Sequence, residues 1–121
     1  MSQTPSSEHY DLEERTFQFA KGVALFVKKL PKTVSNIEYS VQVVKASGSV
    51  GANYREANEA LSKKDFLMRA KISRKEAKES AYWLRLIAET NDEPHRKENM
   101  DLMNEAVELK KILSSIISKS E

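Results

Sequence analysis

The chain has 121 residues, of which 40% are hydrophobic and 31% are charged, and its net charge is +2 at neutral pH. A single domain of this size buries roughly two-thirds of its unfolded surface, which is enough to form a core of its own. The lack of cysteine excludes disulfides, thiolate metal sites and cysteine nucleophiles, and it fits a reducing compartment, so we expect a cytoplasmic protein. The low glycine and proline content indicates an all-helical chain.

The N-terminal part of the chain is predicted to contain a flexible tail and then a helix. Residues 1–10 are polar and lack the basic-then-apolar order of a signal peptide, so we expect one domain over residues 11–121. The first helix is predicted from Asp11, a good capping residue, to Leu30. Its apolar positions recur every three or four residues, as in a core-facing stripe. They are Leu12, Thr16, Phe19, Val23, Phe26 and Leu30.

A second helix is predicted from the segment 33–36, with Ser35 and Asn36 as candidate caps, to about Ala60. It has two apolar tracks, one of which comprises Val34, Ile37, Val41, Val44, Gly48 and Gly51. The other comprises Tyr39, Val43, Ala46, Val50, Tyr54, Ala57 and Leu61. Each glycine costs a helix up to about 1 kcal/mol relative to alanine. We therefore expect either a close approach of another helix or a local break at residues 47–51.

Three polar residues follow within or just after the glycine-containing stretch: Ser49, Asn53 and Glu56. Polar side chains beside a close helix contact often form a hydrogen-bond network that fixes register, and we predict such a structural network here. Ordinary solvated surface is the alternative.

The third helix, predicted over residues 62–89, organises the chain. Ser62 is its expected N-cap, with Asp65 in the capping-box position three residues later. One stripe comprises Phe66, Ala70, Ser73, Ala77, Ala81 and Leu84. A second apolar face comprises Met68, Ile72, Trp83 and Leu86. A second face must be covered, either inside the chain's own bundle or at a subunit interface.

A basic ridge separates these two faces. Residues 62–90 carry eight basic and four acidic groups, whereas the rest of the chain is close to neutral or acidic. The ridge comprises Lys64, Lys71, Lys75, Lys78 and Arg85, with Tyr82 among them. Such a ridge can follow a phosphate backbone, with the tyrosine as a stacking surface, or it can simply be a solvated face.

A fourth helix is predicted over residues 96–118, after loop-forming residues at 90–94. Its stripe comprises Leu102, Ala106, Leu109, Leu113 and Ile116. Four amphipathic helices with short connections favour an antiparallel, up-down-up-down four-helix bundle. Di-iron bundles need histidine and glutamate at fixed helical spacing, but the two histidines, His9 and His95, lie in the tail and beside a loop proline. We expect no metal, no cofactor and no catalytic site.

Several segments resemble the four-helix bundle protein family, which is encoded in intervening sequences of bacterial 23S rRNA genes. They are RTFQFA at residues 15–20, KKLP at 28–31, SVGANYREA at 49–57 and KEAKESAYWL at 75–84. The resemblance implies an antiparallel bundle that assembles as a ring-like homopentamer without catalytic activity. It also implies a distant relation to the accessory proteins of diversity-generating retroelements, which bind nucleic acid and partner a reverse transcriptase.

These observations lead to two hypotheses. The first is a non-enzymatic homo-oligomer, pentameric by the resemblance, that binds RNA or DNA through the basic ridge and has a reverse transcriptase or another protein as a further partner. Its copies would meet through the second apolar face of the third helix. The alternative is a protein-interaction scaffold that does not bind nucleic acid. Neither hypothesis involves a membrane, because no apolar run approaches the length of a membrane span.

Overall fold

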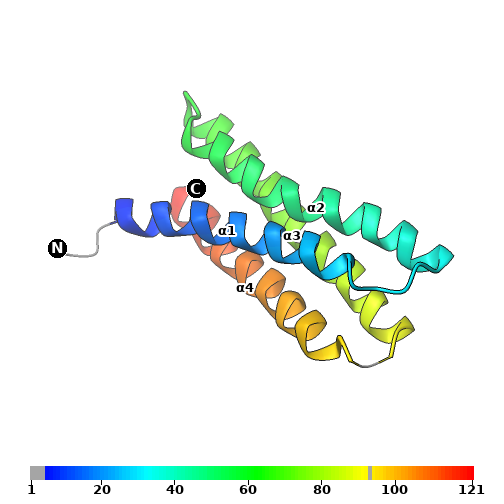
Figure 1. Cartoon of the computed structure of the whole chain (residues 1–121). Coiled ribbons are helices and arrows are strands. Elements are labelled where there is room, and N and C mark those ends of the chain that lie inside the picture. The colour runs from blue at the N-terminus through cyan, green and yellow to red at the C-terminus, as the bar shows by residue number, and fades with distance from the viewer. Residues whose placement is uncertain (1–4, 93) are drawn as a thin grey trace.

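Four helices form the bundle shown in Figure 1. The computed structural model describes residues 5–92 and 94–121, with side chains from residue 11 onward. In chain order the helices are α1 (Pro5–Val27), α2 (Val34–Asn58), α3 (Lys63–Thr90) and α4 (Arg96–Ser120). The described residues contain no strand, so the predicted all-α, four-helix fold is confirmed. Within the same residues, no helix is both long and apolar enough to cross a bilayer.

The ends of α1 differ from the prediction. The helix begins at Pro5 rather than near Asp11, and it therefore includes part of the predicted tail; residues 1–4 of that tail lie outside the described residues. Proline suits the first helical position, where its missing N–H would have no intrahelical partner. The α-helix ends at Val27, and a tighter turn continues it to Leu30, whose N–H donates to the Val27 carbonyl at 3.3 Å.

Side-chain caps fix the starts of α2 and α3. The Thr33 hydroxyl accepts a hydrogen bond from the Asn36 N–H at 3.1 Å, so Thr33 is the cap and the candidates Ser35 and Asn36 were wrong. Both lie inside the first turn, two and three positions after the residue whose side chain can accept from that turn. The Ser62 cap is confirmed, because its hydroxyl accepts from the Asp65 N–H at 3.1 Å.

Helices that are neighbours in the chain pack side by side, and α1 also packs against α4. Among the described residues, α1 makes no close backbone approach to α3, and α2 makes none to α4. The helices therefore surround one core in chain order. The whole predicted stripe of α1, from Leu12 to Leu30, is buried in this core, as predicted. On α3 the small-residue stripe is likewise buried or half-buried.

The two apolar tracks of α2 have different environments. The track that includes Val43, Val50 and Tyr54 is buried in the core, except that Tyr39 is half-buried. Leu61, its last member, lies in the α2–α3 connection and is 98% exposed. The track from Val34 to Gly48 faces away from the core, and only Gly51 at its end is buried.

The helix α2 is continuous through both glycines, so the local break considered above does not occur. A Cβ atom at Gly51 would lie 2.9 Å from the Thr16 Oγ1 atom of α1, which shows a close approach of the two helices at this point. A Cβ atom at Gly48 would meet nothing within 4 Å. The close helix contact therefore explains Gly51 but not Gly48.

A buried and a half-buried amide side chain connect the ends of two helices. The side chains of Asn36 and Asn91 bind each other reciprocally, with each Nδ2 donating to the other Oδ1 at 2.8 Å. The same Nδ2 atoms donate to the carbonyl oxygens of Pro31 and Ile87, respectively, both at 2.9 Å. This pair joins the start of α2 to the end of α3. Because buried amides without partners are costly, it also constrains how the two helices align.

Candidate functional site

A hollow of about 410 Å³ between α3 and α4 gathers positive charge. Its lining, which we call the basic cleft, comprises Lys71, Arg74, Lys75, Lys78, Lys110 and Ser114. The α3 members recur at three- and four-residue intervals, which places them along one side of the helix. The cleft therefore brings together three of the lysines that were predicted from the ridge.

The cleft has no acidic residue in its lining. Among the described residues, no carboxylate lies within 4 Å of the charged groups of Arg74, Lys75, Lys78 or Lys110. Only Lys71 is paired, with its Nζ atom 3.4 Å from Glu121 Oε2, and both side chains are about half exposed. The cleft therefore retains a positive field.

Three members of the cleft were missed in the sequence: Arg74, Lys110 and Ser114. Arg74 could have been predicted from the sequence, because it lies three residues after Lys71 and four before Lys78. In the structure its Nη1 atom is 3.5 Å from Ser114 Oγ. The two α4 residues give no such signal, because their proximity depends on how α4 aligns with α3. Both are half-buried.

The remaining ridge residues lie elsewhere on α3. Arg85 is paired with Glu89 at 3.1 Å, and both line a separate hollow of about 230 Å³ with Tyr82 and Leu86. The Tyr82 ring is exposed and contacts Trp83 edge-on, with ring centroids 5.1 Å apart. The ridge is thus divided into the basic cleft and a second, neutralised hollow.

The other predicted α3 position, Lys64, is exposed in the first turn of the helix, outside both hollows. It therefore adds positive charge to the N-terminal end of α3 without contributing to the lining of the cleft.

The predicted polar network is organised around Asn53. Its Nδ2 atom donates to the Ser49 carbonyl at 3.0 Å, and its Oδ1 atom accepts from Arg69 Nη1 at 3.0 Å. Arg69 on α3 was not predicted as a member. Glu56, the third predicted member, is exposed. Asn53 therefore links α2 to α3, as a structural contact would.

The second apolar face of α3 is partly covered by the chain itself. Trp83 is half-buried against Tyr39 of α2, with ring centroids 5.9 Å apart, and its Nε1 donates to Glu79 at 3.1 Å. Of the four residues predicted for an oligomer interface, Ile72, Trp83 and Leu86 are half-buried and Met68 is exposed.

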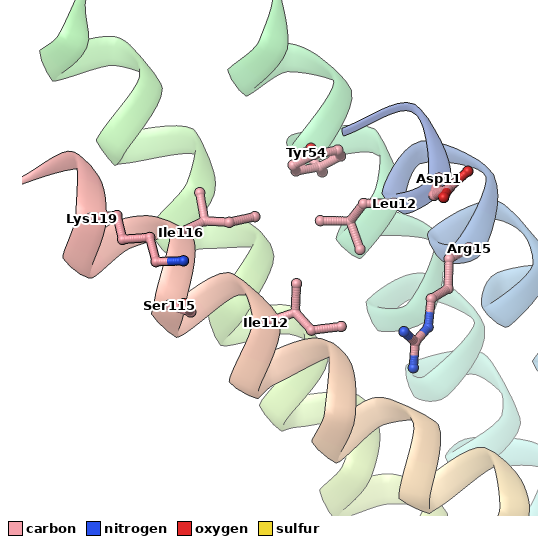
Figure 2. Close-up of a pocket in the computed structure, with 8 residues that line it drawn as sticks. All are labelled: Asp11, Leu12, Arg15, Tyr54, Ile112, Ser115, Ile116 and Lys119. Carbon is pink, nitrogen blue, oxygen red and sulfur yellow. The ribbon is translucent and has the colours of Figure 1, made fainter. Parts of the chain in front are cut away.

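A further hollow, of about 380 Å³, lies between α1, α2 and α4 (Figure 2). Three aliphatic side chains, those of Leu12, Ile112 and Ile116, point into the space. Arg15 at its edge already donates two hydrogen bonds to Glu105, at 2.6 and 2.9 Å. This hollow therefore offers less free charge for recognising a ligand than the basic cleft does.

The chemistry available in the basic cleft is anion binding. Lysine and arginine donate charge-assisted hydrogen bonds to phosphate oxygens, and the serine hydroxyl can donate another. Within the residues that the structure describes, no three His, Asp or Glu side chains come together as metal ligands would.

Comparisons with known proteins agree with this fold. A family model described as 23S rRNA-intervening sequence protein matches residues 8–115. A crystal structure of a protein with unknown function from the S23 ribosomal protein family of Bacteroides thetaiotaomicron is similar, with a TM-score of 0.79 and 32% identity. The match covers 91% of this chain and 97% of that one. A comparison with curated proteins returns no match.

Proposed function

Because the chain belongs to the 23S rRNA-intervening sequence protein family, we propose that it is a non-enzymatic homo-oligomeric bundle that binds RNA or DNA through backbone phosphates. The observation that carries this proposal is the basic cleft, with its five cationic side chains and no acidic residue in its lining. In this proposal the protein acts in the cytoplasm, with a reverse transcriptase or another protein as a further partner.

The contacts between α1 and α4 support the antiparallel arrangement that the proposal includes. Arg15 of α1 is paired with Glu105 at 2.6 Å, and Lys29, in the turn that follows α1, is paired with Glu98 at 2.9 Å. As the residue numbers rise from Arg15 to Lys29, those of their partners on α4 fall from Glu105 to Glu98, as expected for antiparallel helices. Such an arrangement keeps α3 and α4 aligned over the length of the cleft.

Self-association strengthens the proposed binding. The cleft extends from Lys71 to Lys78, about 10 Å along α3 at 1.5 Å per residue, so one copy can contact only a few phosphates. A ring of copies, five by the family resemblance, repeats the positive field without changing the charge of each subunit. Exposed apolar residues such as Ile37 and Val41 support contacts between copies.

The proposal is tested by fluorescence anisotropy with a labelled single-stranded RNA and a labelled duplex DNA. If each cleft neutralises about three to five phosphates, raising the salt from about 50 to 200 mM should weaken binding of the duplex by roughly 40- to 500-fold and binding of the single strand by roughly 20- to 130-fold. Replacing Lys71, Lys75 and Lys78 with glutamate should abolish binding. Since these lysines are exposed, the helical content should not change.

A matched variant controls for net charge. Replacing Lys21, Lys97 and Lys111 with glutamate makes the same charge change outside the cleft, and it should retain most of the affinity. Equal losses in the two variants would assign binding to net charge alone and reject the cleft. Wild-type protein that binds neither probe at low salt would reject the nucleic-acid proposal and favour the scaffold.

A further inference from the structure

The exposed ring of Tyr82 lies in line with the basic cleft. Tyr82 follows Lys71, Lys75 and Lys78 at intervals of three or four residues, which keep all four side chains on one side of α3. From Lys71 to Tyr82 this row is about 17 Å long at 1.5 Å per residue. The tyrosine therefore stands at one end of a row of cations, one helical turn after the last lysine of the cleft.

The Tyr82 ring is oriented by other aromatic side chains. It is 57% exposed and meets the Trp83 ring in a T-shaped arrangement, with centroids 5.1 Å apart and planes inclined by 74°. Trp83 is held in turn by the Tyr39 ring of α2, at 5.9 Å, and by its hydrogen bond to Glu79. An exposed ring that its neighbours already orient loses little freedom when a planar ligand stacks on it.

The hollow beside this ring suits an uncharged ligand. Its lining also includes Leu86, Arg85 and Glu89, and the charged groups of the last two are paired at 3.1 Å. Its volume of about 230 Å³ is smaller than that of pockets for drug-sized ligands, which hold about 300–1,000 Å³. A phosphate gains little from cationic groups that are already neutralised, whereas a flat ring gains contact with tyrosine and leucine. The basic cleft thus suits phosphates, and the neighbouring hollow suits a single base.

We propose that the protein selects single-stranded nucleic acid, with consecutive phosphates in the basic cleft and an unpaired base stacked on Tyr82. The faces of the bases in a duplex are covered by their neighbours, so a duplex can bring phosphates to the cleft but, away from its ends, no base to the ring. At the 3.4 Å spacing of a stacked strand, the row from Lys71 to Tyr82 spans about five nucleotides. Stacking on an aromatic ring tolerates any base, so we expect little preference among sequences.

The inference rests on the proposed function, because it needs the phosphate contacts of the cleft, and adds to it a choice between strands. The row of cations and the cleft belong to α3 and α4, whereas Ile37 and Val41, which support contacts between copies, lie on α2. Contacts through those two residues therefore use a different helix from the one that carries Tyr82.

An abasic strand separates stacking from phosphate binding. Fluorescence anisotropy compares the binding of the full chain to four labelled probes of about ten nucleotides: a dT strand, a U strand, an abasic deoxyribose strand and a DNA duplex. We expect the dT strand to bind about 5- to 150-fold more tightly than the abasic strand, which has the same phosphates but no bases. The dT strand should also bind more tightly than the duplex. The U strand shows whether ribose strengthens this binding.

Variants of Tyr82 assign the difference to its ring. Tyr82→Ala should lose the advantage of dT over the abasic strand while binding the abasic strand as the wild type does. Tyr82→Phe, which keeps the ring, should retain that advantage. Phe17→Ala is the matched control, because it removes a similarly exposed ring, at 53%, from α1.

Trp83 supplies a second measurement, because it is the only tryptophan of the chain and lies next to Tyr82. The dT strand should change its emission, and the abasic strand should not. Equal binding of the dT strand and the abasic strand or duplex, or a Tyr82→Ala variant that still prefers dT, would overturn the inference and leave the proposed function intact. Failure of the wild type to bind any of the four probes at low salt would reject both.

Discussion

Alanine at Gly51 should destabilise the protein, although alanine is the better helix former. The substituted Cβ would lie 2.9 Å from Thr16 Oγ1 and 3.3 Å from Thr16 Cβ. Thr16 is fully buried, and its hydroxyl donates to the Glu13 carbonyl at 3.0 Å, so it has little freedom to move. The added Cβ would therefore clash with Thr16, which cannot easily move away.

The magnitude follows from three opposing terms. Helix propensity favours alanine by up to about 1 kcal/mol. Overpacking a filled site costs about 1–3 kcal/mol, and disturbing the hydrogen bond of Thr16 costs about another 1 kcal/mol. We expect Gly51→Ala to lower the free energy of unfolding by about 1–3 kcal/mol. Gly48→Ala, which meets no neighbour, should raise that of the dissociated chain by about 0.5–1 kcal/mol.

The assay is urea unfolding followed by circular dichroism, at concentrations where the chains are dissociated. The Thr16→Ala background identifies the cause, because removing Oγ1 should reduce the cost of Gly51→Ala by about 1 kcal/mol or more. If Gly51→Ala is as stable as the wild type, or costs the same without the threonine, the close contact between α1 and α2 does not determine this glycine.

Two further predictions concern buried polar and charged groups. Asn36→Leu should lower the free energy of unfolding by about 1–3 kcal/mol, because Asn91 loses its reciprocal partner; urea unfolding that shows no loss would contradict this. Burial, and then the neighbouring Glu79, raise the pKa of Glu76, while Lys75 and Lys45 oppose the shift. The folded state therefore favours the protonated acid, so ionised Glu76 costs stability at pH 7 and this cost disappears as the pH falls through its folded pKa. Glu76→Gln should accordingly unfold at a higher temperature than the wild type at pH 7 but not at pH 4, and equal melting temperatures at pH 7 would refute the reasoning.

Local signals in the sequence were sufficient to predict the four helices. The stripe of α1 was predicted completely because its spacing is unbroken, and the Ser62 cap because it stands alone before a long helix. The α2 cap was missed because Thr33, Ser35 and Asn36 are all good capping residues within four positions. Which of the three residues caps the helix depends on the position of the turn at Pro31, and the capping preferences of the residues do not specify that position.

The contacts between helices could not be predicted from the sequence. The two tracks of α2 are similarly apolar, and the inner one was identifiable only from its partners, such as Trp83 against Tyr39. Lys110 and Ser114 join the basic cleft through the alignment of α4 with α3. That alignment depends on side-chain packing over the whole bundle rather than on spacing within either helix.

The reciprocal amide pair of Asn36 and Asn91 has a consequence for folding fidelity. It joins residues that are 55 positions apart, so it can form only after α2 and α3 have docked. Sliding either helix by one turn, about 5.4 Å, would strand both amides against apolar side chains. The pair thereby penalises misaligned intermediates that the aliphatic core alone, with its repeating valines and alanines, would tolerate.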